Sequence, residues 1–362
     1  KHRFAATMGS RSREARENLE PVGTGPFKHG EFRPAALLRA DLYPGYHQPN
    51  RPHFDRLEMT GGGDSLLAAR AVLQTGEFDL APTVRVDDEL LRKLEAAGKG
   101  RVLYSFGSAT TALHLNATDP AQEVDGERSS IKTQHPLWSD PVVRRAFGLL
   151  IDRAGIQQHL YGRQAVATAN WINNPPRYRS GVPSLEFSID KARALLDGAG
   201  WKPGADGVRV KDGKRLAVLF QGSSGAVGEK TMTVVKAAAE KAGFAVELKL
   251  VPGSVFFSSD LGNPDTFGKF HADIQIFNAL SGSPDARDMA SVLLSTEAAT
   301  KANKWLGRNK ARWQSTEYDA LFQASESELD PARRTALFVR MNELIAQAGY
   351  VLPVVSSSYV TV

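Results

Sequence analysis

The sequence of 362 residues contains no cysteine. That absence excludes disulfides, thiolate nucleophiles, iron–sulfur ligands and cysteine-type zinc sites. The sequence also has no apolar run near the roughly 20 residues that a membrane-spanning helix needs. Residues 1–8 have neither the apolar core nor the small-residue cleavage site of a signal peptide. Composition alone therefore fits a periplasmic or a cytosolic protein.

The net charge is small, since the sequence has 45 Lys and Arg and 40 Asp and Glu. The densest positive stretch, residues 301–312, includes Trp305. A surface that follows a phosphate backbone needs more concentrated charge, so we expect no nucleic-acid partner. The hydrophobic fraction of 42% and the length are typical of a globular protein with two or three domains.

Capping residues predict four helices. An Asp side chain can accept the free N–H groups at a helix start, and a Gly adopts the left-handed conformation that ends one. The predicted starts and ends are Asp64 to Gly76, Asp140 with Pro141 at the first turn, Asp190 to Gly200, and Asp330 with Pro331 to Gly349. The segment 77–80 is predicted to be a strand.

Residues 215–277 form the clearest α/β unit. An alternating strand is followed by a helix from about 229 to 241, and then by a strand that turns Val246, Leu248 and Leu250 inward. A third strand contains Ile274 and Ile276. Strand–helix–strand at this spacing favours a parallel crossover, and hence an α/β lobe.

The segments that resemble catalytic motifs lack residues that those motifs require. Residues 222–231 follow a strand and open a helix, but Glu229 would direct negative charge at a bound phosphate, so we interpret them as a connecting loop. The eight histidines do not cluster, which predicts no metal site. No nucleophile stands with a base, which predicts a protein that is not an enzyme and needs no cofactor. The alternative is an α/β hydrolase or transferase without a recognised motif.

Two residue pairs have a structural and a functional interpretation. Asp87 and Asp88 fit the charged start of a helix better than a catalytic dyad. Trp305 and Trp313 are predicted to pack, with a ligand platform as the alternative.

Seven elements in one order carry a family resemblance. They are Val22–Phe27 (V-G-T-G-P-F), Thr75–Asp79, Leu113–Asn116, Asp140–Phe147 with Ile151–Arg153, Ile189–Leu196 with Ala199–Trp201, Glu317–Asp319, and Asp330–Arg334. Each motif is weak alone, but together the sequence resembles the family 5 extracellular solute-binding proteins, which are the peptide, nickel and opine receptors of ABC importers.

The resemblance implies a two-lobed α/β fold of the periplasmic-binding-protein type (type II, cluster C), without the first part of lobe I and the small extra domain. It implies that residues 1–128 are the remainder of lobe I, 129–349 the second lobe, and 350–362 a return strand. The hinge is expected near 125–135 and 347–352. We expect an exported, periplasmic monomer that captures a peptide-like or other small solute between its lobes and delivers it to a membrane permease.

In peptide-binding members of this family, the loop after a strand like 273–277 offers an aromatic residue and an aspartate for the peptide's amino group. Aligned on Pro284, this sequence has Phe277 at the aromatic position and Leu280 at that of the aspartate. A buried ammonium group without a carboxylate is costly, so Leu280 argues against free-amine peptides. Asp285 either replaces the aspartate or caps the next helix, and capping is favoured.

The expected ligand-binding residues come from two loops. They are Phe277, Asn278, Leu280, Ser281, Ser283 and Asp285 after the strand, and Trp171, Asn173 and Asn174 beside Pro175 and Pro176. The alternatives are a plain surface loop for the first set and packing within its own lobe for Trp171. Arg287 and the mildly basic charge raise an anionic or amide-rich solute as a further expectation, with a solvated Arg287 as the favoured alternative.

Overall fold

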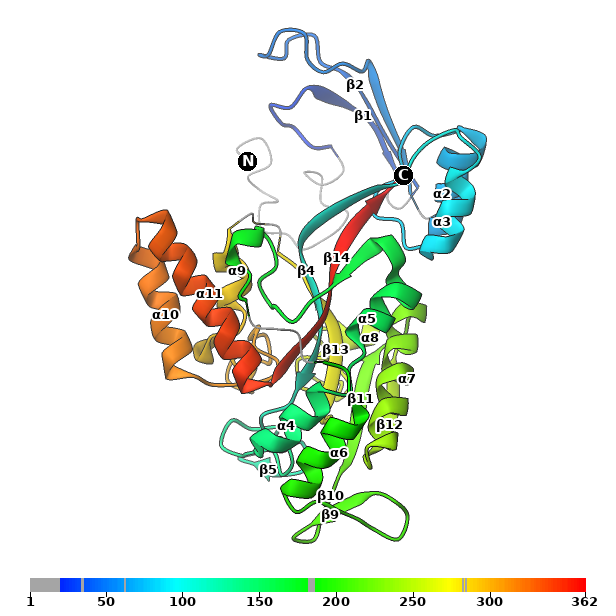
Figure 1. Cartoon of the computed structure of the whole chain (residues 1–362). Coiled ribbons are helices and arrows are strands. Elements are labelled where there is room, and N and C mark those ends of the chain that lie inside the picture. The colour runs from blue at the N-terminus through cyan, green and yellow to red at the C-terminus, as the bar shows by residue number, and fades with distance from the viewer. Residues whose placement is uncertain (1–19, 34–35, 62, 182–185, 282, 284) are drawn as a thin grey trace.

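The computed structural model describes residues 20–33, 36–61, 63–181, 186–281, 283 and 285–362. These residues form a small upper unit and a larger lower lobe, with two long strands running between them (Figure 1). Pro284, on which the loop after residue 277 was aligned with the family, lies outside the described residues.

The upper unit combines an antiparallel sheet with short helices. The sheet order is β1-β2-β3, with β1 (Phe27–Arg33), β2 (Leu37–Leu42) and β3 (Arg56–Thr60). The helices are α2 (Ser65–Arg70), a π-helical turn η2 (Ala71–Thr75) and α3 (Asp88–Glu95). As predicted, Asp64 caps α2, and Gly76 with φ 71° ends the following turn. The predicted strand at 77–80 is wrong, because the N–H groups of Glu77 and Phe78 both donate to Ala71 and complete the helix end.

A six-stranded sheet in the order β12-β11-β13-β4-β14-β7 forms the centre of the lower lobe. Its strands are β4 (Leu103–Leu115), β7 (Ala165–Ala167), β11 (Ala217–Ser223), β12 (Ala245–Val251), β13 (Ile274–Ala279) and β14 (Val351–Thr361). Strand β11 is parallel to β12 and β13, which confirms the predicted crossover through α7 (Ala226–Lys241). Leu250 is exposed, against expectation, because its neighbour across the strands is Gly222, which has no side chain to cover it.

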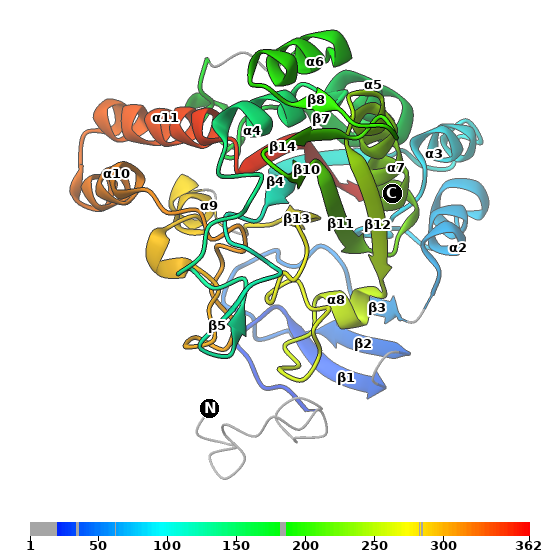
Figure 2. The same ribbon diagram turned by 90° about the horizontal axis from the view of Figure 1, so that it is seen from below.

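Helices and short hairpins surround this sheet. They are β5 (Glu123–Val124), β6 (Glu127–Arg128), α4 (Pro141–Gly148), α5 (Arg153–Ile156), η3 (Gln157–Tyr161), η4 (Gly162–Gln164), η5 (Pro176–Tyr178), α6 (Ile189–Gly198), β8 (Lys202–Pro203), β9 (Arg209–Lys211), β10 (Lys214–Arg215), α8 (Gly253–Phe256), α9 (Ala286–Ser291), η6 (Ser295–Glu297), α10 (Thr316–Ser327) and α11 (Pro331–Ala348). Seen from below, α4 and α6 lie on one side of the sheet and α8 on the other, and α9–α11 form a separate group (Figure 2).

The caps of these helices follow the sequence with one exception. Asp140 caps α4, and Asp330 caps α11, as predicted. Helix α6 starts earlier than expected: the Ser188 hydroxyl accepts from the backbone N–H of Lys191, and Asp190 lies inside the first turn. Both Ser and Asp accept backbone N–H groups well, so residue type alone could not choose between them.

The passage between the two units lies within β4 and β14. Val102 and Val360 pack in the upper core, whereas Leu113 and Leu352 pack in the lower one. The polar stretch near 125–135 belongs wholly to the lower lobe, where His135 bonds to Asp273. This packing favours a boundary within β4, because β4 runs from one core to the other without a break.

A buried ionic contact also joins the units. Asp88, 7% exposed, accepts hydrogen bonds from the Arg163 backbone (3.1 Å), the Arg163 guanidinium (2.8 Å) and the Tyr104 hydroxyl (2.8 Å). Burial pushes the pKa of Asp88 up, but these donors outweigh it and the pKa is lowered overall. Asp88 thus stands at a helix start, as expected, and its carboxylate fixes the position of α3 against residues 162–164.

Candidate ligand-binding site

Strand β13 ends at the edge of the lower lobe that is nearest the upper unit (Figure 1). Its last residue, Ala279, is paired with Thr110, halfway along β4, and β4 continues from there into the upper unit. The residues that follow β13 therefore lie at the end of the lower lobe that is nearest the upper unit.

Phe277 belongs to a row of rings that crosses this end of the sheet. Its ring stacks on His114 with centroids 4.0 Å apart, and the ring of Phe267 meets it edge-on at 5.7 Å. Phe257 continues the row at 5.4 Å from Phe267. Such offset and edge-on contacts stabilise aromatic clusters and hold each ring in place. Phe277 is half-buried, so one part of its ring remains accessible.

Phe277 and Asn278 were expected after the strand but lie within β13, and the other expected residues, which differ in exposure, follow it. Asn278 and Leu280 are exposed, the latter 53%. Ser281 is buried, and its hydroxyl accepts from the Ser283 backbone N–H at 3.1 Å. Asn278 and Leu280 thus remain candidates for ligand contact, whereas Ser281 holds the turn.

Trp171 is brought close to Phe277 through His114, and both Trp171 and Asn173 are buried. The indole of Trp171 has no exposed surface and donates from Nε1 to the Met289 carbonyl at 2.8 Å. Asn173 donates to the Thr110 hydroxyl at 2.9 Å. In this structure the packing alternative therefore describes Trp171. Asn174 is half-buried beside it.

The charged residues of this loop are already engaged. Asp285 caps α9 and is bound by both terminal nitrogens of Arg334, at 3.0 and 3.1 Å. The hydrogen bond from Arg334 lowers the pKa of Asp285. Arg287 pairs with Glu326 at 2.7 Å. Capping, the favoured role of Asp285, is confirmed, and Arg287 does not offer a free positive charge.

A cavity of about 240 Å³, which we call the lysine–tryptophan cavity, continues from the row of rings. Phe257 and Phe267 form its apolar wall, and Trp305 lies among the other lining residues. Lys269, Lys304 and Lys310 also line it, against a single carboxylate, Asp260. Sequence reasoning missed this cavity because the loops 257–269 and 304–310 carry no motif and meet only in the fold. The ligand-platform alternative fits the position of Trp305, while Trp313 packs in the core.

Two positive charges lie under this cavity. Lys310 is 6% exposed; its ammonium group donates to the Trp305 carbonyl at 3.1 Å and lies 4.4 Å from the centre of the Phe267 ring. Burial and the nearby Arg312 lower the pKa of Lys310 to about 8. Arg312 is 2% exposed and donates to four backbone carbonyls, and neither it nor Lys310 pairs with a carboxylate in the part of the chain that the structure describes.

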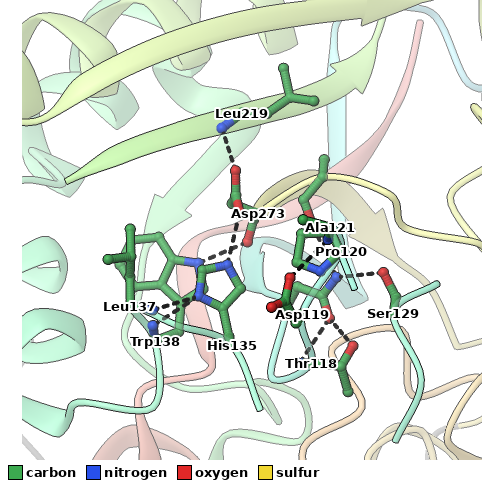
Figure 3. Close-up of polar contacts among 12 residues, drawn as sticks. Thr118, Asp119, Pro120, Ala121, Ser129, His135, Leu137, Trp138, Leu219 and Asp273 are labelled. Carbon is green, nitrogen blue, oxygen red and sulfur yellow. Dashed lines mark hydrogen bonds and ion pairs between the residues drawn. The ribbon is translucent and has the colours of Figure 1, made fainter. Parts of the chain in front are cut away.

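His135 and Asp273 form a buried pair that resembles part of a catalytic triad (Figure 3). The Nδ1 of His135 accepts the backbone N–H groups of Leu137 and Trp138, both at 3.0 Å, so the ring proton must be on Nε2, which donates to Asp273 at 2.8 Å. Asp273 also accepts from the Leu219 backbone at 2.6 Å. Both ring nitrogens are therefore occupied, and the pair ties β11 and β13 to the loop before α4.

The described ranges contain neither a metal-binding cluster nor a membrane-spanning helix. No group of three or more His, Asp or Glu side chains there could hold a metal ion. None of the helices in those ranges is long and apolar enough to cross a bilayer.

Comparison with known proteins decides the family. A family model described as bacterial extracellular solute-binding proteins, family 5 Middle, matches residues 4–301. The chain belongs to this family. This membership confirms the resemblance carried by the seven sequence elements, and family 5 proteins are solute-binding receptors of ABC transporters.

Relatives of this family 5 protein bear names of the same kind. A putative ABC transporter peptide-binding protein of Brucella ovis is 26% identical over 319 residues, which are 88% of this chain and 54% of the relative. The oligopeptide-binding protein AppA of Bacillus subtilis is 26% identical over 243 residues, 65% of this chain and 40% of its own. The chain thus spans about half the length of the curated relatives that it matches.

Solved structures of family 5 proteins share the fold. AppA of Bacillus subtilis, solved with a nonapeptide, superposes with a TM-score of 0.69 at 21% identity, over 97% of this chain and 64% of AppA. NikZ of Campylobacter jejuni, solved with Ni(L-His), gives 0.71 at 18% identity, over 95% and 63%. The two-lobed α/β fold expected from the sequence is therefore confirmed.

Proposed function

We propose that this chain is the solute-binding part of an ABC importer receptor. It holds a peptide-like or other small solute between the upper unit and the lower lobe and presents it to a membrane permease. The observation that carries this proposal is the position of Phe277, Asn278 and Leu280 at the end of β13 that adjoins the upper unit. Accessible aromatic and amide groups on a rigid strand end suit the binding of apolar and peptide groups.

Closure would occur by bending of β4 and β14. The pairing of β14 with β4 shifts register between Pro353 and Val355 and again between Ser356 and Ser358. Such bulges bend a strand locally. The second shift lies between Val355, which packs in the lower core, and Val360, which packs in the upper core. Binding of the solute to both units would shift the population towards the closed form.

We further propose that the solute is not a peptide recognised by its free amino group. Leu280 carries no charge, and Asp285 is held by Arg334. An ammonium group at this loop would find no free carboxylate from either residue. The test is mass spectrometry of small molecules released from protein purified from its own cells, where recovery of ordinary di- to pentapeptides would refute this part.

The receptor itself is tested by intrinsic fluorescence, because the chain contains five tryptophans. We expect the recovered solute to change the emission in a saturable way. No recovered solute, together with no response to peptides, opines or metal chelates, would contradict the proposed function. The family is extracellular, which supports a periplasmic location and a permease partner. We propose a monomer with no resident cofactor, no nucleic-acid partner and no catalysis.

A further inference from the structure

Positive side chains outnumber negative ones in the lysine–tryptophan cavity among the described residues. Three lysines and one aspartate line it, and Arg312 lies beneath with its guanidinium bound only to backbone carbonyls. Buried charges are ordinarily paired, because an isolated charge loses its hydration without recompense. An anionic group in the cavity would supply the missing partner.

Donors in the cavity are also incompletely used. The Lys310 ammonium group has three N–H donors, and the structure gives it one hydrogen bond, to the Trp305 carbonyl. The indole Nε1 of Trp305 is buried without a hydrogen-bond partner among the described residues. Native proteins leave few buried donors unpaired, and each such donor calls for an acceptor. Both residues line the cavity.

The remaining surface of the cavity is apolar and aromatic. The rings of Phe257 and Phe267 face it, and Lys269 lies with its ammonium group 5.0 Å from the centre of the Trp305 ring. At about 240 Å³ the cavity is smaller than the roughly 300–1,000 Å³ of a complete small-molecule pocket. It therefore suits one group of a larger solute, with an anionic end and a flat apolar body.

We propose that the lysine–tryptophan cavity is a subsite for a carboxylate-bearing aromatic or apolar group of the solute, with Lys310 and the Trp305 indole as the anion-binding donors. This inference rests on the proposed receptor function and specifies the substrate class for it. It also replaces Arg287, which Glu326 neutralises, as the origin of a preference for anionic solutes.

The groups that surround Lys310 determine how it should respond. Lys269, Lys304 and Asp260 line the same cavity, and the charges of Arg312 and Glu297 act on Lys310. Burial is the main cause of the lowered pKa of Lys310; Arg312 lowers it further, and Glu297 opposes the change. A carboxylate placed against Lys310 would reverse this effect and raise its pKa, so that binding near pH 8.5 takes up protons.

The experiment compares 3-phenylpropanoate with 3-phenylpropanamide, which have the same shape and differ in charge. Calorimetric titration of the 362-residue chain should show the acid binding about tenfold more tightly than the amide, as expected for a hydrogen bond to a charged group. Lys310→Met should abolish this ratio. Lys93→Met, which removes an exposed lysine paired with Glu89, should preserve it.

A second measurement needs no variant: in unbuffered solution at about pH 8.5 the acid, and not the amide, should cause proton uptake on binding. Any of four results would overturn the proposal: equal affinities for acid and amide, no binding of either at about 10 mM, an unchanged affinity ratio in Lys310→Met, or no proton uptake. These results concern only the two probes. The receptor function fails on a different result, namely that no solute recovered from the native protein binds the chain.

Discussion

Trp171→Ala is expected to destabilise the protein strongly. The indole has no exposed surface and packs in the core formed by α9, α10 and α11. Replacing a buried Trp by Ala costs about 3–5 kcal/mol through lost burial and the cavity left behind. The Met289 carbonyl would also lose its donor, which adds about 1 kcal/mol. Because whole domains are stable by only about 5–15 kcal/mol, the loss should be obvious in urea unfolding.

Two matched variants separate the contributions. Trp171→Phe keeps most of the ring and loses the hydrogen bond, so it should cost about 1–3 kcal/mol. Trp305→Ala removes a partly exposed tryptophan that lines the lysine–tryptophan cavity, and should cost less than Trp171→Ala. The reasoning would be refuted if Trp171→Ala unfolded at the wild-type urea concentration and yet lost solute binding, since Trp171 would then act on the ligand and not in the core.

Three further predictions concern stability. Asp285→Asn should lower the free energy of unfolding by about 1 kcal/mol at pH 7 by breaking the pair with Arg334. Because the pKa of Asp285 in the folded chain lies below the ordinary 3.8, the difference from wild type should vanish as the pH falls through that lowered pKa. A difference in unfolding free energy that persists in acid would contradict this prediction. Gly162→Ala should cost about 1–3 kcal/mol, since a Cβ atom there would lie 2.7 Å from the Cβ of Asp88 at φ 53°, and an unchanged melting temperature would disprove this contact. Lys310→Met should stabilise the chain at pH 7 by at most about 3 kcal/mol. The stability of the wild type should rise between pH 8 and 10.5, because the unfolded chain there still holds a proton that the folded chain has released, and the variant should lack this rise. Parallel pH profiles of the two proteins would contradict this prediction.

The sequence predicted those parts of the fold that depend on local chemistry. Asp140 and Asp330 cap their helices because a carboxylate can accept the free N–H groups wherever the chain turns into a helix. The strand at 77–80 failed because Glu77 and Phe78 complete a preceding helical turn, a competition that alternation of residue types does not reveal. The boundary near residue 128 was expected because a polar loop resembles a linker; Ser129 in this loop is nevertheless buried and its hydroxyl donates to the Phe270 carbonyl.

The candidate site was predicted only in part. Phe277 became a candidate through the resemblance, and its position follows from the register of β13 on β4. Trp171 was misleading because a tryptophan beside two prolines suits a ligand-facing loop and a packed one equally well. Lys310 was missed because its charge matters only through burial beneath Phe267 and above Arg312, and no spacing along the chain encodes that burial.

The central claim is that a solute closes the upper unit onto the lower lobe. Because the chain has no cysteine, spin labels can be attached uniquely through Thr60→Cys on β3 and Leu329→Cys, which is 93% exposed before α11. The measurement is the distance distribution between the two labels, without and with the solute recovered from the native protein. The account predicts a shorter and narrower distribution when the solute binds. An unchanged distribution in the presence of saturating bound solute would contradict it.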